Sequence, residues 1–82
     1  MANVLFFGRL RDICGPERVI ALTPGIRTLA DVKAALGAAD EAIFAALHAP
    51  GVRAALNQAF ADDSALIAGD CEIAFMSPLS GG

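Results

Sequence analysis

The 82-residue sequence predicts an α+β fold, in which a small mixed β-sheet carries one main helix on one of its faces. Apolar runs typical of strands lie near both ends, apolar residues at helical spacing lie between them, and Gly and Pro separate the segments. The length allows one domain, near the lower size limit for an independent core, and the apolar content of 56% suffices to form one. A chain this small has little room for an enclosed pocket, which argues against a self-sufficient enzyme.

The first half of the sheet is expected from residues 4–7 and 18–22. Residues 4–7 (VLFF) are apolar on both faces, which predicts a central strand. A turn signal at 14–16 (CGP) separates them from the second strand, and the short separation indicates an antiparallel hairpin.

The main helix is expected to begin after Thr28. Thr28 offers an N-cap, and Asp31 three residues later completes an approximate capping box. Gly37 is a candidate C-cap. The apolar residues at helical spacing are Leu29, Val32 and Leu36.

The second half of the chain predicts a short helix at 40–47 and further strands. Residues 52–57 read as a strand, although their alanines also suit a helix; 59–61 continue that strand or pair with it across a turn at 57–58. The last strand is expected at 71–76. The residues expected on one face of the short helix are Ile43, Phe44 and Leu47.

The first and last strands are both suited to the centre of the sheet. If they pair in parallel they need a long crossover, which the intervening helix supplies. That architecture is the β-grasp, which the apolar pattern permits without excluding other α+β folds. We predict a β-grasp domain over residues 1–77 and a flexible C-terminal Gly-Gly arm over residues 78–82.

The charge distribution is uneven. A net charge of -3 argues against a nucleic-acid partner. Residues 1–39 hold five basic and three acidic side chains (+2), whereas residues 40–82 hold one basic and six acidic side chains (-5). The acidic half is interpreted equally well as a solvated face or as a docking surface for a basic partner.

Cysteine usage and hydropathy indicate a cytoplasmic protein. Cys14 and Cys71 are far apart and make no metal motif, so both are expected to be reduced, small hydrophobes. No signal peptide and no bilayer-spanning apolar stretch are evident, and no membrane association is expected. No metal site and no cofactor bound by this chain are expected.

The end of the chain carries the most reactive candidate group. Pro78 lacks an N–H and favours an extended Ser77, so the last strand should stop there. Five residues from Pro78 reach at most ~17 Å, enough to enter a partner's active site. Gly81 and Gly82 lack side chains, so they fit a narrow channel and leave the terminal carboxylate unhindered. This carboxylate is ionised at neutral pH and can attack the α-phosphate of ATP.

The alternative for a Gly-Gly end taken alone is a frayed tail. Elsewhere in the sequence the candidates for a reactive site are weaker. His48 is the only histidine and has no fixed Ser or Cys partner, and no phosphate-binding or dinucleotide motif is present.

Three segments, in order along the chain, resemble the small subunit of molybdopterin synthase. Residues 4–12 (VLFFGRLRD) resemble its opening strand, and residues 55–58 (ALNQ) resemble its V-N-Q segment. Residues 69–82 (GDCEIAFMSPLSGG) are similar to its G-D-E-V-A-F-x-P-P-V-[ST]-G-G ending. Two departures are an inserted or substituted Cys71, and Met76-Ser77 where an aromatic and a proline are common. The second departure is expected to loosen the base of the arm.

The resemblance implies a ubiquitin-like β-grasp sulfur carrier. A ubiquitin-activating-type adenylyltransferase would use ATP to adenylate Gly82, which would then become a thiocarboxylate. The arm, with Pro78, Leu79, Ser80 and Gly81, would enter the molybdopterin synthase large subunit and donate sulfur to cyclic pyranopterin monophosphate. The active site would lie in that subunit, within a heterotetramer.

The resemblance also places Phe7 and Arg11 at positions that would face the partner. For Phe7, packing in the core is an equally good alternative. Two rival functions stay open: a sulfur carrier for thiamine, cysteine or tRNA thiolation, and an interaction module or protein modifier that needs no thiocarboxylate.

Overall fold

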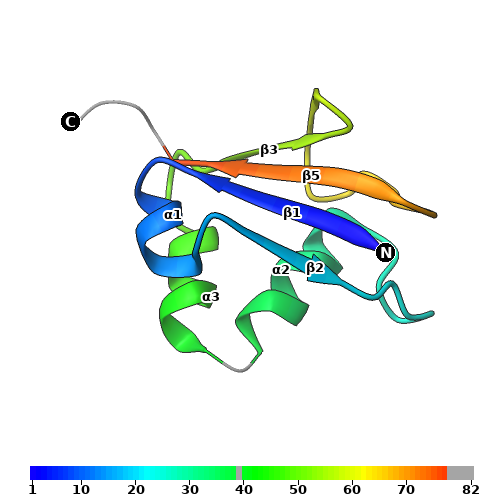
Figure 1. Cartoon of the computed structure of the whole chain (residues 1–82), viewed down its shortest axis with the longest axis horizontal. Coiled ribbons are helices and arrows are strands. Elements are labelled where there is room, and N and C mark those ends of the chain that lie inside the picture. The colour runs from blue at the N-terminus through cyan, green and yellow to red at the C-terminus, as the bar shows by residue number, and fades with distance from the viewer. Residues whose placement is uncertain (39, 78–82) are drawn as a thin grey trace.

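The computed structural model describes residues 1–38 and 40–77, which form a five-stranded sheet with three helices on one of its faces (Figure 1). In chain order the elements are β1 (Ala2–Phe7), α1 (Arg9–Cys14), β2 (Glu17–Ile20), α2 (Leu29–Gly37), α3 (Glu41–Leu47), β3 (Arg53–Leu56), β4 (Ala59–Ala61) and β5 (Cys71–Met76).

The sheet has the order β2-β1-β5-β3-β4, which places the two ends of the folded chain side by side. β1 and β5 are parallel and paired along their whole length, from Ala2 opposite Cys71 to Phe7 opposite Met76. Figure 1 shows their arrowheads at the same end of the sheet. β2 is antiparallel to β1, as predicted, and β3 is antiparallel to both β5 and β4. The fold is therefore the ubiquitin-like β-grasp, and the prediction is confirmed.

The core lies between the sheet and the helices. β1 alternates strictly: Ala2, Val4 and Phe6 are buried, whereas Phe7 is exposed and Leu5 is only half-buried. The strand is internal to the sheet, as its apolar sequence predicted, yet helices cover only one of its two faces. The other large side chains that are fully buried are Leu29, Val32, Ile43, Leu47, Ile73 and Phe75.

Helix α1 was missed by the sequence analysis, which expected a plain loop between the first two strands. Leu10 and Cys14 are four residues apart, so they lie on the same side of this short helix. Both are buried, and they pack the helix against the core. A six-residue helix is far too short to be stable alone, so tertiary packing has to hold it.

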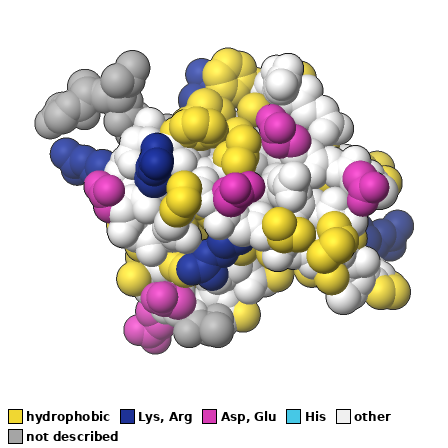
Figure 2. Space-filling model, in the orientation of Figure 1, with side chains coloured by type: hydrophobic (Ala, Val, Ile, Leu, Met, Phe, Trp, Pro, Cys, Tyr) yellow, Lys and Arg dark blue, Asp and Glu magenta, His cyan; other side chains and the backbone are white. Residues whose placement is uncertain are grey.

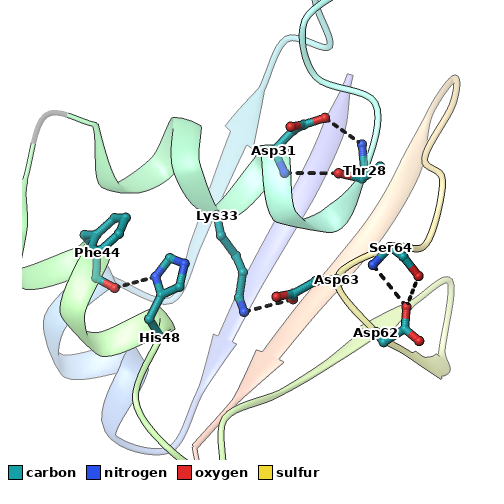
Figure 3. A network of polar contacts seen from close by, with 8 residues as sticks. All are labelled: Thr28, Asp31, Lys33, Phe44, His48, Asp62, Asp63 and Ser64. Carbon is teal, nitrogen blue, oxygen red and sulfur yellow. Dashed lines mark hydrogen bonds and ion pairs between the residues drawn. The ribbon is translucent and has the colours of Figure 1, made fainter.

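Helix α2 begins with the predicted capping box. The Thr28 hydroxyl accepts the N–H of Asp31 (3.3 Å), and the Asp31 carboxylate accepts the N–H of Thr28 (3.1 Å) (Figure 3). The same carboxylate also accepts the N–H of Arg27 at 2.9 Å. The prediction for Gly37 was wrong, because Gly37 is the last helical residue and Ala38 is the cap. A Cβ on Gly37 would lie 2.7 Å from Cβ of Phe44, so the glycine permits α2 and α3 to pack closely.

Helix α3 is confirmed and is capped by the Asp40 carboxylate, which accepts the N–H of Ala42 at 2.9 Å. Its predicted apolar face is correct for Ile43 and Leu47, which are buried. Phe44 lies outside this face, and its ring stacks on His48 with 4.2 Å between centroids.

The ambiguous segment at 52–57 forms strand β3, which turns tightly into β4. Asn57 (φ 49°) and Gln58 (φ 71°) both adopt positive φ, as a two-residue hairpin turn requires. The side-chain oxygen of Asn57 accepts the N–H of Glu72 at 2.9 Å, which ties this turn to β5. The choice between helix and strand therefore depended on partners distant in the sequence.

We predict that the capping box makes folding stability depend on pH. Hydrogen bonds from the Arg27 and Thr28 amides lower the pKa of Asp31 below its ordinary value. Its contribution is therefore fully present above the pKa of an unfolded Asp, about 3.9, and is lost as the pH falls through the lower folded value.

Urea unfolding of the wild type and of Asp31→Asn between pH 7 and pH 3 tests this. The variant should be the less stable at pH 7, and the difference should shrink on acidification. Asp12→Asn, which removes an exposed carboxylate from α1, is the matched control. A difference for Asp31→Asn that stays constant over the whole range would contradict the prediction.

Candidate functional site

The predicted reactive end, Gly82 with Gly81, Ser80, Leu79 and Pro78, lies outside the residues that the structure describes. The same holds for the predicted division into a domain and an arm at residue 78. What the structure does describe is the point from which these residues continue. β5 ends at Met76 in the middle of the sheet, between β1 and β3, and Ser77 follows it.

Ser77 is bound to the beginning of α1. Its hydroxyl oxygen accepts the N–H of Arg9 at 2.9 Å, across 68 positions of sequence. Gly8, where the chain turns from β1 into α1, has φ 65°, and a Cβ at this position would overlap Ser77 Oγ. Ser77 is thus hydrogen-bonded to the domain. Whether the departure at Met76-Ser77 loosens the base of the arm stays a prediction.

Phe7 lies on the uncovered side of the sheet, beside the end of β5. Its partners across the strands are Met76 in β5 and then Arg53 in β3, so the three side chains form one row on the same face. Phe7 is 48% exposed, which excludes the alternative that it packs in the core. Its role in binding a partner stays a prediction.

A second row runs parallel to the first; it is apolar at the centre of the sheet and ends at the exposed Glu17 in β2, opposite Leu5. Asn3 and Glu72 follow in the next row of the same side. Leu5, Ala74, Ala55 and Phe60 face one another across β1, β5, β3 and β4. Phe60 is 65% exposed, and the guanidinium carbon of Arg53 lies 4.1 Å from the centre of its ring, a cation–π contact. We name this surface the open face; its residues are Leu5, Phe7, Arg53, Ala55, Phe60, Ala74 and Met76.

Arg11 does not lie on the open face. It is an exposed residue of α1, in the helical layer, although α1 packs against the same end of β1 and β5 from which Ser77 leads on. Figure 2 shows basic side chains at the end of the molecule that carries α1, with hydrophobic side chains beside them. Phe7 and Arg11 therefore lie on two layers that meet at one end of the domain.

Arg53, Phe60 and the Ser77 contact were not predicted from the sequence as parts of this end of the molecule. The signal for Arg53 and Phe60 was the two-residue turn at 57–58, which sets the register that places them on one face. No local signal points to the bond between Ser77 and Arg9, because it joins residues at opposite ends of the sequence.

The acidic side chains of the second half are mostly engaged within the chain. Asp62 accepts the hydroxyl (2.5 Å) and the N–H (3.0 Å) of Ser64, and these bonds lower its pKa; Asp63 pairs with Lys33 at 2.9 Å (Figure 3). Asp40 caps α3. These contacts favour the interpretation of a solvated surface with local structural roles over a single acidic docking patch.

The thiols and the histidine do not assemble a catalytic site. Burial raises the pKa of Cys14 and of Cys71, which keeps both thiols protonated at neutral pH. His48 Nδ1 lies 2.8 Å from the carbonyl oxygen of Phe44, within its own helix turn. Within residues 1–38 and 40–77, no three His, Cys, Asp or Glu side chains are grouped as metal ligands.

An open groove of about 640 Å³ lies beside Lys33, between α2 and the β3–β4 hairpin. Its acidic side chains, Asp62 and Asp63, are already bound to Ser64 and Lys33. The residues that line the groove therefore do not pair a free nucleophile with a base. No helix in the part of the chain that the structure describes is long and apolar enough to cross a bilayer.

Comparison with solved structures places the fold among known proteins. SAMP1 from Haloferax volcanii superposes with a TM-score of 0.82 at 23% identity, covering 99% of this chain and 98% of that one. A second structure, of H. volcanii small archaeal modifier protein 1, gives a TM-score of 0.80 at 20% identity, with 95% and 97% of the chains covered. At these identities the likeness is one of fold. No curated protein sequence matches the chain.

Comparison with family models gives a more specific result. The model of the ThiS family matches residues 4–82, which is nearly the whole chain and includes the Gly81-Gly82 end. The chain therefore belongs to the ThiS family of ubiquitin-like sulfur carriers.

Proposed function

We propose that this chain is the sulfur-carrier subunit of molybdopterin synthase, with Gly82 as the group that carries the sulfur. The observation that carries the proposal is the family match, which extends to residue 82 and so includes the Gly-Gly end. The family as a whole leaves the pathway open. The opening residues 4–12 and the ending at 69–82, which resemble the molybdopterin synthase small subunit, favour molybdenum cofactor synthesis.

The first step is activation of the C-terminal carboxylate. An adenylyltransferase of the ubiquitin-activating type binds ATP, and a carboxylate oxygen of Gly82 attacks the α-phosphate. A P–O bond to the leaving pyrophosphate breaks, and an acyl-adenylate forms. Because Gly81 and Gly82 have no side chains, the backbone can enter a narrow active site without steric hindrance.

The second step exchanges oxygen for sulfur. A sulfide equivalent from a donor protein attacks the acyl carbon, AMP leaves, and Gly82 becomes a thiocarboxylate. In the large subunit this sulfur is transferred to cyclic pyranopterin monophosphate, and water restores the Gly82 carboxylate. Two such transfers supply the dithiolene of one molybdopterin. All catalytic groups belong to the partners, so Gly82 acts as a carried substrate.

The open face is the surface that we assign to the large subunit. Six of its seven residues are apolar and the seventh is Arg53; it lies uncovered on the sheet, and it borders the point where Ser77 leads to the reactive end. Aromatic and Arg side chains such as Phe7, Phe60 and Arg53 are typical anchors of protein interfaces. A partner bound here would meet the start of the arm directly.

A second candidate function is protein modification, favoured by the resemblance of the fold to H. volcanii small archaeal modifier protein 1. Such a role would use the same adenylate and would end in an isopeptide bond to a lysine of another protein. It requires no thiocarboxylate and no pterin. The two functions therefore differ in the final product at Gly82.

We predict that the chain, co-expressed with its adenylyltransferase and a sulfur source, gains the mass of one oxygen-to-sulfur exchange at Gly82. Intact-mass spectrometry followed by C-terminal peptide sequencing measures this. Deletion of Gly82 should abolish the exchange and leave the melting temperature unchanged, because within residues 1–38 and 40–77 the last core residue is Phe75.

Three results decide between the functions. Transfer of the sulfur to the pterin precursor on addition of the large subunit supports the molybdopterin pathway. A thiocarboxylate that persists in that mixture indicates a different sulfur pathway. An unchanged mass, together with an adenylyltransferase shown to be active, contradicts both carrier functions, and isopeptide-linked products would then identify a modifier.

We also predict that Phe7→Ala weakens binding to the large subunit by about tenfold or more, the effect expected of a central interface anchor. Phe44→Ala is the matched control, because Phe44 has the same 48% exposure but lies in the helical layer. Isothermal titration calorimetry with both variants, each verified as folded by circular dichroism, gives the comparison. Equal losses for the two variants would exclude the open face as the docking surface.

A further inference from the structure

We propose that Ser77 is a positioning residue, whose bond to Arg9 fastens the root of the C-terminal segment to the domain and so fixes where that segment leaves toward the adenylyltransferase. The inference rests on the proposed function, since it concerns how Gly82 is delivered. We name the contact of Ser77 with Gly8 and Arg9 the clasp.

The clasp solves a capping problem at the start of α1. The first N–H groups of a helix have no acceptor within the helix. Gly8, which precedes α1, has no side chain with which to accept one, and no side-chain cap is made from that position. Ser77 Oγ accepts the N–H of Arg9 instead, at 2.9 Å. The cap of α1 is thus supplied from the other end of the chain.

Gly8 makes room for this bond. Its φ of 65° turns the chain out of β1, and its missing Cβ leaves the space that Ser77 Oγ occupies. Any larger residue at position 8 would both strain the backbone and displace the hydroxyl. The absence of a side chain at Gly8 and the position of the Ser77 hydroxyl therefore depend on each other.

The location of the clasp gives it a role in delivery. β1 and β5 are paired as far as Phe7 and Met76, and immediately beyond that pair the two chains part: β1 turns into α1 and β5 continues through Ser77. The bond from the Arg9 N–H to Ser77 lies where the two chains part, and it keeps the last residue pair, Phe7 and Met76, from separating. It also fixes Ser77 itself, so less conformational entropy has to be lost at this residue when the end of the chain enters an active site.

The clasp should act on the step after docking. Ser77 is not an open-face residue and its hydroxyl oxygen already accepts the N–H of Arg9, so we expect loss of this bond to leave docking of the adenylyltransferase intact. Within the docked complex, a smaller fraction of the ends would be correctly inserted. The expected signature is a lower kcat with little change in KM.

The test compares the wild type, Ser77→Ala, Ser77→Thr and Ser64→Ala. Ser77→Thr keeps the hydroxyl and should restore wild-type behaviour. Ser64→Ala is the control, because it removes an exposed hydroxyl that donates to Asp62, away from this end of the sheet. Two measurements are made: NMR hydrogen exchange of the Arg9 amide, and the kinetics of pyrophosphate release with the adenylyltransferase at varied carrier concentration.

For Ser77→Ala we expect the Arg9 amide to exchange about three- to tenfold faster, as loss of one hydrogen bond implies. We expect kcat to fall by a similar factor of about three to ten while KM stays within about twofold. Ser77→Thr and Ser64→Ala should match the wild type in both measurements.

Unchanged Arg9 exchange and unchanged kcat in Ser77→Ala would overturn the proposal. So would a fall in kcat that Ser77→Thr does not restore, because the hydroxyl would then not be the cause. If the adenylyltransferase fails to activate even the wild type, the proposed function fails, and the exchange of Arg9 in the Ser77 variants still decides whether the clasp exists.

Discussion

The parallel pairing of β1 with β5 is the constraint on which the rest of the structure depends. It joins the first and last strands over six consecutive residue pairs and places them at the centre of the sheet. Strands that run parallel cannot be joined by a tight turn, so the chain between them has to cross over the sheet. Here that crossover contains α2 and α3, and the stacked rings of Phe6 and Phe75, with centroids 6.1 Å apart, lie in the layer that the helices bury.

Because the described helices all lie on one face, they leave the other face of the sheet uncovered. The consequence is an apolar surface built from strands that are internal to the sheet, adjacent to the end of β5. In the function that we propose, one interface with a larger protein would both cover this face of the sheet and receive the C-terminal residues that follow β5.

The same pairing explains how a small domain without a catalytic cluster among its described residues can take part in demanding chemistry. The central strand β5 is held by β1 on one side and by β3 on the other, so the residue after it starts from a rigid position. The clasp of Ser77 with Gly8 and Arg9 extends that rigidity by one residue. In the function that we propose, reactivity resides in the terminal carboxylate, while adenylation and sulfur transfer are left to partners that provide enclosed active sites.

The sequence by itself determined the elements whose signals are local. The Thr28–Asp31 capping box, the apolar periodicity of α2 and the apolar first and last strands depend on neighbouring residues, and each was predicted. The turn at Asn57 and Gln58 is also local and was one of two predicted alternatives. The Gly-Gly end is also a property of the sequence alone, as is its interpretation as a reactive carboxylate.

Only the tertiary structure decided the features that depend on distant partners. Helix α1 is too short to be stable without the core, the strand at 53–56 needed its neighbours to be distinguished from a helix, and Gly37 proved to be a packing residue. Phe7 suits both the core and an exposed apolar surface, so the sequence alone could not decide in which of the two its side chain lies. The bond between Ser77 and Arg9 spans 68 positions and exists because β1 and β5 end together, which no local pattern encodes.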